Sequence, residues 1–304
     1  MTTACVREVG LRDGLQLTET RLDTATKVEW IRQQAAAGFR EIEVTSFVPP
    51  KLLPQFSDAA EVVEAANAID GLSPVSLVLN QKGAERAIAA GARHLTYVVS
   101  ASEAHSQSNV RCSTDEAIAR FPGIVALATA AGATIGVAVS TSFGCSLQGQ
   151  VEDARVLSIV ETLSAHGAAE IALADTVGYA SPADVTRLFR AAAQATDCTL
   201  AAHFHDTRGL GLANVVAAVE CGVRQFDASL GGLGGCPFAP GASGNIATED
   251  CVYLLESLGL ATGVSLDALV ALRKQLDSWL PNETLYGKLA LAGPARTFAA
   301  ASAA

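Results

Sequence analysis

Residues 200–214 read LAAHFHDTRGLGLAN, and this stretch changes character twice within a short distance. An apolar run ends in His203 and His205, the chain breaks at Gly209, and a helical pattern of apolar residues follows. Alternate side chains of a β-strand face the same side, so His203 and His205 point the same way at the end of a strand. The stretch therefore predicts a strand–turn–helix unit that carries a pair of imidazoles where the strand ends.

The same unit recurs along the whole chain. Short β-rich runs are found at residues 6–9, 41–45, 75–79, 94–99, 134–139, 170–174, 199–204 and 225–228. Helical patterns alternate with them at residues 24–37, 58–68, 82–90, 114–131, 151–166, 182–195, 210–221 and 247–257. Glycines stand where several of these helices should end, as left-handed C-cap residues do. They are Gly38, Gly91, Gly132, Gly167 and Gly222.

Repeated strand–helix units predict parallel strands joined by right-handed crossovers. Their number favours an α/β fold of the (β/α)8 TIM-barrel type with a short C-terminal helical extension. An open doubly wound sheet is the alternative, and it is disfavoured because no early G-x-G-x-x-G turn occurs. We expect a single domain over residues 1–304, with the barrel at about 5–260, a helical segment at about 261–290 and a frayed tail at 295–304.

The composition supports a large apolar core and argues against several classes of protein. Of the 304 residues, 50% are hydrophobic and 17% are charged. The net charge is −10 and no basic block occurs, so we expect no nucleic-acid partner. No apolar run approaches the ~18 residues of a membrane span, so no membrane association is expected.

The cysteines indicate a reducing compartment. The chain contains seven cysteines, which are scattered and odd in number, and this pattern is typical of free thiols. The N-terminus shows no charged segment followed by an apolar one, as a signal peptide would. We therefore expect a cytoplasmic location.

In a TIM barrel the chemistry lies at the carboxyl ends of the strands. The polar residues found there in this sequence are Glu8, Arg12, Asp13, Glu43, Asp175, His203, His205, Asn245 and Glu249. The Asp13 carboxylate, both imidazoles and the Asn245 amide oxygen form a mixed oxygen and nitrogen set, which suits Mg²⁺ or Mn²⁺. Simpler interpretations stay open, since polar residues at strand ends also bond nearby loops and Asn245 also suits a helix N-cap.

Residues 231–245, GGLGGCPFAPGASGN, form a long glycine-rich loop. A loop of ~15 residues inside a compact domain is usually functional. Cys236 lies between Gly235 and Pro237, which favours an exposed thiol that acts as a catalytic acid or base on a closing lid. A flexible connector that carries an inert thiol is the alternative.

Several motifs together resemble hydroxymethylglutaryl-CoA lyases, which belong to a wider group of metal-dependent TIM-barrel lyases and condensing enzymes. The motifs are GLRDGLQ (10–16), EVTSFVPPKLLPQ (43–55), LADTVG (173–178), HFHDT (203–207), GGLGGCPFAPGASGNIATED (231–250) and YLLESLG (253–259). The resemblance covers nearly the whole chain, from about residue 6 to about residue 293. GGLGGCP together with R-D-G-L-Q is highly specific, whereas H-x-H and an early R-D pair are shared across the wider group.

The resemblance implies a role for each matching residue. It assigns the metal ligands, which would hold Mg²⁺ or Mn²⁺, to Asp13, His203, His205 and Asn245. It gives Arg12 a contact with the acyl oxygen, Cys236 the lid position and Glu43 an active-site place, and lets His203 also carry a proton. Supporting acidic residues are Glu8, Asp175 and Glu249. Candidate contacts to CoA are Lys51 and Lys288, and a homodimer or higher homo-oligomer is expected.

The implied reaction is a retro-Claisen cleavage of 3-hydroxy-3-methylglutaryl-CoA to acetyl-CoA and acetoacetate, as in leucine degradation and ketone-body formation. Arg208 and Phe238 depart from the family pattern, which leaves the acyl group open. The alternatives are a longer-chain 3-hydroxyglutaryl-CoA, a citramalyl-CoA or the reverse condensation. A barrel that binds acyl-CoA or metal without turnover is an alternative from another class.

Overall fold

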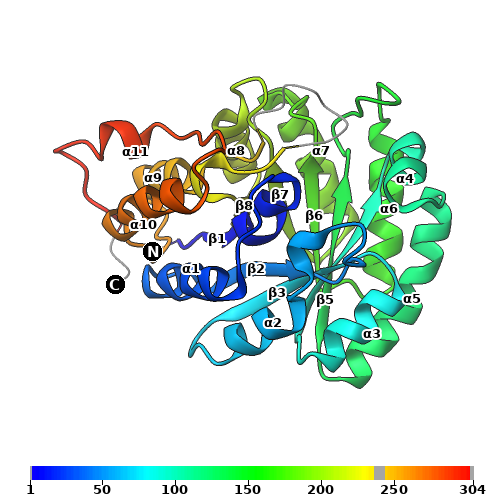
Figure 1. The fold of residues 1–304 in the computed structure, drawn as a ribbon. Coiled ribbons are helices and arrows are strands. Elements are labelled where there is room, and N and C mark those ends of the chain that lie inside the picture. The colour runs from blue at the N-terminus through cyan, green and yellow to red at the C-terminus, as the bar shows by residue number, and fades with distance from the viewer. Residues whose placement is uncertain (1, 236–243, 302–304) are drawn as a thin grey trace.

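The computed structural model describes residues 2–235 and 244–301. Within these residues, eight parallel strands close a barrel in the order β1 to β8, with β8 paired to β1 (Figure 1). The strands are β1 Cys5–Glu8, β2 Glu41–Ser46, β3 Ser73–Val78, β4 His94–Ser100, β5 Thr134–Ser140, β6 Glu170–Asp175, β7 Thr199–Phe204 and β8 Gln225–Ala228. The predicted α/β TIM barrel is confirmed.

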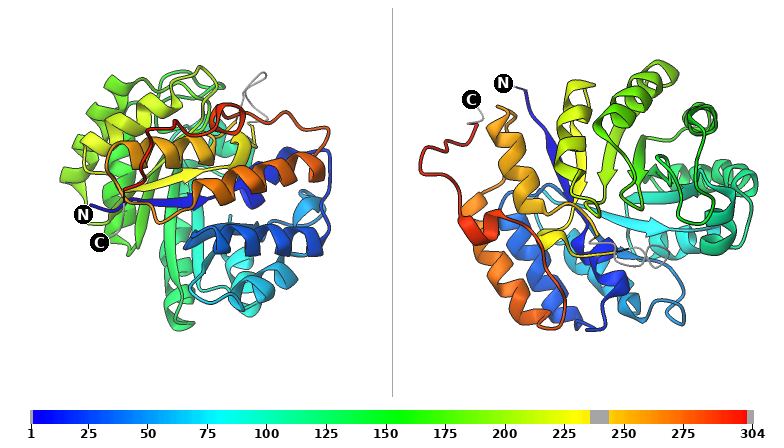
Figure 2. Two further views of the ribbon diagram at one scale, coloured as in Figure 1. Left: turned by 90° about the vertical axis from the view of Figure 1, so that its left-hand side faces the viewer. Right: turned by 90° about the horizontal axis from the view of Figure 1, so that it is seen from above.

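Helices surround this barrel and pack their apolar sides on it (Figure 2). They are α1 Thr24–Ala36, α2 Ala59–Asn67, α3 Gln81–Ala89, α4 Glu103–Val110, α5 Thr114–Ala130, α6 Asp153–Ala165, α7 Pro182–Ala195, α8 Gly211–Glu220, α9 Thr248–Ser257, α10 Leu266–Trp279 and α11 Leu289–Ala292. The ends of the predicted strands and helices differ from those observed by at most two residues. Each glycine expected to end a helix has a positive φ angle.

The segment after α9 packs on the chain itself. The buried side of α10 contains Leu269, Leu272 and Leu276, and the ring of Trp279 lies 6.2 Å from that of Trp30 on α1. The apolar character of residues 266–280 is thus used within the chain. It gives no support for the expected homo-oligomer.

The chain end differs from the expected frayed tail. The ring of Phe298 lies 4.8 Å from that of Tyr253 on α9. The backbone N–H of Ala301 donates a hydrogen bond of 2.7 Å to Glu256. Residues 295–301 are therefore held against α9, while residues 302–304 lie outside the described part. Among the described residues, none of the helices combines the length and apolar character that a membrane span requires.

Candidate functional site

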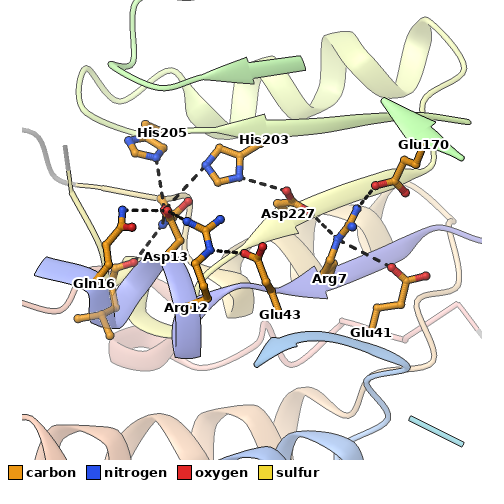
Figure 3. A network of polar contacts seen from close by, with 12 residues as sticks. Arg7, Arg12, Asp13, Gln16, Glu41, Glu43, Glu170, His203, His205 and Asp227 are labelled. Atoms are coloured by element: carbon orange, nitrogen blue, oxygen red, sulfur yellow. Dashed lines mark hydrogen bonds and ion pairs between the residues drawn. The ribbon is translucent and has the colours of Figure 1, made fainter. Parts of the chain in front are cut away.

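Arg12 and Asp13 follow β1 in a π-helical turn, Gly10–Gly14. The carbonyl oxygen of Val9 accepts hydrogen bonds from the backbone N–H groups of Asp13 at 2.7 Å and Gly14 at 3.3 Å. Single π-turns are frequent at functional sites. Here the turn aims the buried carboxylate of Asp13 at the imidazoles of β7 (Figure 3).

His203, His205 and Asn245 meet Asp13 at the mouth of the barrel. The Nε2 atoms of His203 and His205 lie 3.9 Å and 3.8 Å from Asp13 Oδ2. Asn245 pairs with His205 through an isolated antiparallel bridge, and its Nδ2 donates to Asp13 Oδ2 at 2.7 Å. The structure therefore brings together the four residues that the sequence suggested as ligands.

This group fits a divalent cation. Asp13, His203 and His205 each offer a ligand atom, and these atoms lie within 4.8 Å of one another. The amide oxygen of Asn245 is buried and has no hydrogen-bond partner among the described residues, so it is an unused oxygen donor at the same place. Carboxylate, amide and imidazole donors without a thiolate suit Mg²⁺ or Mn²⁺.

Arg12 supplies positive charge beside this group. Its guanidinium forms ion pairs with Asp13 and with Glu43 on β2. Burial acts to raise the pKa of Asp13, but Arg12 and the two imidazoles outweigh it and hold that pKa well below its usual range. Burial raises the pKa of Glu43 above its ordinary value in spite of Arg12. The Asp13 carboxylate is therefore ionised, as a metal ligand must be.

Charged residues inside the barrel escaped the sequence analysis. Nδ1 of His203 lies 3.1 Å from Oδ2 of Asp227, and Oδ1 of Asp227 accepts a hydrogen bond of 3.0 Å from Nε of Arg7. Burial acts to lower the pKa of His203, but the carboxylates of Asp227 and Asp13 raise it overall. Gln16 was also missed, and it donates to Asp13 Oδ1 at 3.2 Å. Charged residues within short apolar strands were the available signal for Arg7 and Asp227.

The expected supporting carboxylates hold the loops around the site. Glu8 accepts hydrogen bonds from the backbone N–H groups of Gly10 at 2.8 Å and Leu230 at 3.0 Å, and from the hydroxyl of Thr248 at 2.7 Å. Asp175 accepts from the backbone N–H groups of Tyr179 and Ala180. Glu249 accepts from the N–H of Gly231 at 3.0 Å. Burial raises the pKa of both Glu8 and Glu249 to about 7.

A cavity of about 310 Å³ opens beside the candidate ligands. Asp13, Glu43, His203 and His205 line one side of it. The other side is apolar, because Val48, Leu77 and Val98 form a small cluster there, apart from the main core, against which Leu53 and Leu79 pack. The cavity thus offers a charged side and an apolar side to one ligand.

Some sequence candidates lie elsewhere. The guanidinium of Arg208 donates to the carbonyl oxygens of Val177 and Gly178 and lies 4.5 Å from the ring of Tyr179. This geometry gives no support for a role of Arg208 in reading the acyl group. Among the described residues that line the cavity, neither Lys51 nor Lys288 occurs. The candidate lid residue Cys236 and the departing Phe238 lie outside the described residues.

Fold and site together define a class: a TIM-barrel enzyme with a candidate divalent-metal centre at the carboxyl ends of its strands. The comparison with known proteins then gives the family. The sequence model of the HMGL-like family matches residues 5–276. The chain belongs to this family, and it is a carbon–carbon lyase.

Relatives from distant organisms support this assignment. The chain is 42% identical to the hydroxymethylglutaryl-CoA lyase of Pseudomonas mevalonii, over 92% of this chain and 93% of that protein. It is also 42% identical to the mitochondrial hydroxymethylglutaryl-CoA lyase of Bos taurus, over 86% of this chain and 81% of that protein.

Solved structures agree with the sequence relatives. An HMG-CoA lyase from Acinetobacter baumannii, in complex with coenzyme A and 3-methylmalate, superposes with a TM-score of 0.92 at 42% identity and covers 98% of this chain and 97% of its own. The carboxyl transferase domain of Rhizobium etli pyruvate carboxylase shares the fold alone, with a TM-score of 0.73 at 19% identity, covering 97% of this chain and 50% of that one.

Proposed function

We propose that this chain catalyses the divalent-metal-dependent cleavage of 3-hydroxy-3-methylglutaryl-CoA to acetyl-CoA and acetoacetate. The observation that carries the proposal is the convergence of Asp13, His203 and His205 within 4.8 Å, with Asn245 beside them. The names of the relatives give the substrate, and the donor set supports a metal-assisted reaction. Mg²⁺ or Mn²⁺ is the proposed ion.

The reaction is a retro-Claisen cleavage. A bound divalent ion would acidify the C3 hydroxyl and fix its orientation. Asp13 or His203 takes the hydroxyl proton as the C2–C3 bond breaks, and the bonding electrons pass into the thioester enolate. Arg12 places positive charge where the enolate oxygen develops, and Glu43 holds the guanidinium in that position.

The enolate carbon then takes a proton, and acetyl-CoA forms. Cys236 or His203 is the proposed donor, and Cys236 would act from a lid that closes over the substrate. Lys51 and Lys288 are the proposed contacts for the CoA phosphates. We further propose a homodimer or higher homo-oligomer in the cytoplasm, with a role in leucine degradation or ketone-body formation.

The test is release of acetyl-CoA and acetoacetate from 3-hydroxy-3-methylglutaryl-CoA by the purified, chelator-treated protein with and without Mg²⁺ or Mn²⁺. Turnover should require the metal and should fall at least about 100-fold in His205→Ala. His94→Ala is the matched control, because His94 lies at the opposite end of its strand and bonds Thr134. Metal-independent turnover would contradict the proposal. Acyl-CoA binding without product in the metal-loaded protein would favour the non-catalytic alternative.

A second candidate substrate has its own support. The apolar side of the cavity, made by Val48, Leu77 and Val98, offers room for a C3 substituent larger than methyl. The same lyase chemistry, or the reverse condensation, would then act on a longer-chain 3-hydroxyglutaryl-CoA or on a citramalyl-CoA. A panel of these thioesters compared by kcat/KM decides, and Leu77→Phe should penalise the longer chain more than the methyl substrate.

A further inference from the structure

The interior of the barrel carries a network of charges below the candidate metal centre. Arg7 on β1 forms ion pairs with Asp227 on β8, Glu170 on β6 and Glu41 on β2 (Figure 3). The Arg7 side chain is 8% exposed. TIM barrels commonly fill this space with branched apolar side chains. Since desolvation of buried ion pairs often cancels their attraction, stability alone does not explain the network.

Asp227 joins this network to the candidate metal centre. Its Oδ1 accepts the hydrogen bond from Nε of Arg7 at 3.0 Å, and its Oδ2 lies 3.1 Å from Nδ1 of His203. The backbone fixes this alignment, because Asp227 is the register partner of Arg7 on β1 and of His203 on β7. Arg7, Asp227 and His203 therefore form one row across three neighbouring strands.

This row determines how the His203 ring presents itself. With Nδ1–H donated to Asp227, the lone pair of Nε2 faces Asp13 Oδ2, which lies 3.9 Å away. A carboxylate bonded to one ring nitrogen fixes the tautomer and orientation of a metal-binding histidine. His205 differs, because its Nδ1 has no hydrogen-bond partner among the described residues. Of this pair of imidazoles, His203 is the one anchored by a carboxylate.

We propose that Asp227, held in place by Arg7, is a positioning residue that fixes the tautomer and ring orientation of His203 for metal binding. The proposal rests on the metal-dependent function proposed above. It assigns a purpose to buried charges that the reaction itself does not use. It also predicts that the two imidazoles contribute unequally to a rigid site.

The experiment compares Asp227→Asn with Glu41→Gln. Both variants remove one carboxylate charge from beside Arg7, but only Asp227 contacts His203. Titration with Mn²⁺, followed by the electron paramagnetic resonance of the free ion, should show metal affinity lowered about 10- to 100-fold in Asp227→Asn. Affinity should stay within about twofold of the wild type in Glu41→Gln. Equal affinities in both variants would overturn the proposal, as would equal losses.

A second measurement needs no variant, and so stands even where Asp227→Asn does not fold. Nitrogen-15 spectra of histidine-labelled, Mg²⁺-loaded wild-type protein should show His203 protonated on Nδ1. A His203 ring protonated on Nε2 alone would overturn the proposal. Because both readouts follow the metal and the ring, absence of hydroxymethylglutaryl-CoA cleavage would contradict the proposed function and leave this result standing.

Discussion

Arg12 lies between the carboxylates of Asp13 and Glu43, and its side chain is 12% exposed. In Arg12→Gln the charge that faces the developing enolate is lost while the length of the side chain is nearly kept. Loss of such a charge costs about 3 kcal/mol of transition-state stabilisation, so kcat should fall at least about 100-fold with a smaller change in KM. Steady-state kinetics with saturating metal provides the measurement.

The matched control for this prediction is Arg21→Gln. Arg21 is an exposed arginine that contacts Ser57, away from the candidate ligands. Its kcat and KM should equal those of the wild type. A kcat for Arg12→Gln within threefold of the wild type would show that the guanidinium does not stabilise the enolate.

The sequence predicted part of the site at this scale. Asp13, His203 and His205 could be placed at one end of the barrel, because the carboxyl ends of parallel strands share an edge. Asp227 could not be assigned, since side-chain alternation tells which face of a strand a residue occupies but not which residue stands beside it on the next strand. Its contact with His203 depends on the register of the closed barrel, which a single strand does not encode.

Among the turns that build the mouth, the one after β6 depends on Gly178. Its φ is +65°, and an added Cβ would lie 2.7 Å from Cβ of Thr207 in the loop after β7. Gly132 has nearly the same φ, +66°, but an added Cβ there meets nothing within 4 Å. The two glycines therefore separate the cost of the left-handed backbone from the cost of crowding.

Gly132→Ala should lower the free energy of unfolding by about 1 kcal/mol, the cost of a left-handed alanine. Gly178→Ala should cost more, about 2–4 kcal/mol, because the added methyl group also displaces Thr207. It should weaken Mn²⁺ binding too, since Thr207 follows His205 closely in the chain. Urea unfolding and metal titration of both variants provide the check, and equal costs would contradict the role of crowding.

Helices were predicted where apolar residues recur with helical spacing. The same rule missed α4, Glu103–Val110, whose sequence EAHSQSNV lacks an apolar stripe. This helix is started instead by Ser102, whose side chain accepts a hydrogen bond from the N–H of His105. Periodicity also identified residues 266–280 as apolar but could not tell whether the partner was α1 of the same chain or a second copy.

At the scale of the whole molecule, buried carboxylates close the seam between β8 and β1. Glu8 on β1 is fully buried and bonds Leu230 after β8 and Thr248 at the start of α9. Glu249 bonds Gly231 in the same region, and its Oε1 lies 3.5 Å from Nε of Arg273 on α10. The closure of the barrel and the seating of its last helices therefore depend on the same acidic residues.

This arrangement predicts a pH dependence of stability in the metal-free protein. Burial raises the pKa of Glu8 from 4.5 to about 7, so the folded state holds a proton there that the unfolded chain releases. The resulting stabilisation is complete below pH 4.5 and is lost as the pH rises through 7. The loss amounts to about 3 kcal/mol of the free energy of unfolding between pH 4.5 and pH 8.

Glu8→Gln isolates this contribution, because glutamine carries no titrating proton. Urea unfolding at pH 5, 6, 7 and 8 should show that the wild type loses more stability with rising pH than Glu8→Gln does. Asp23→Asn is the control, since the hydrogen bond from the N–H of Thr26 lowers the pKa of Asp23 and places its titration below this range. Its profile between pH 5 and 8 should run parallel to that of the wild type. Parallel profiles for all three proteins would mean that Glu8 is ionised throughout, and that the seam holds a buried charge instead of a proton.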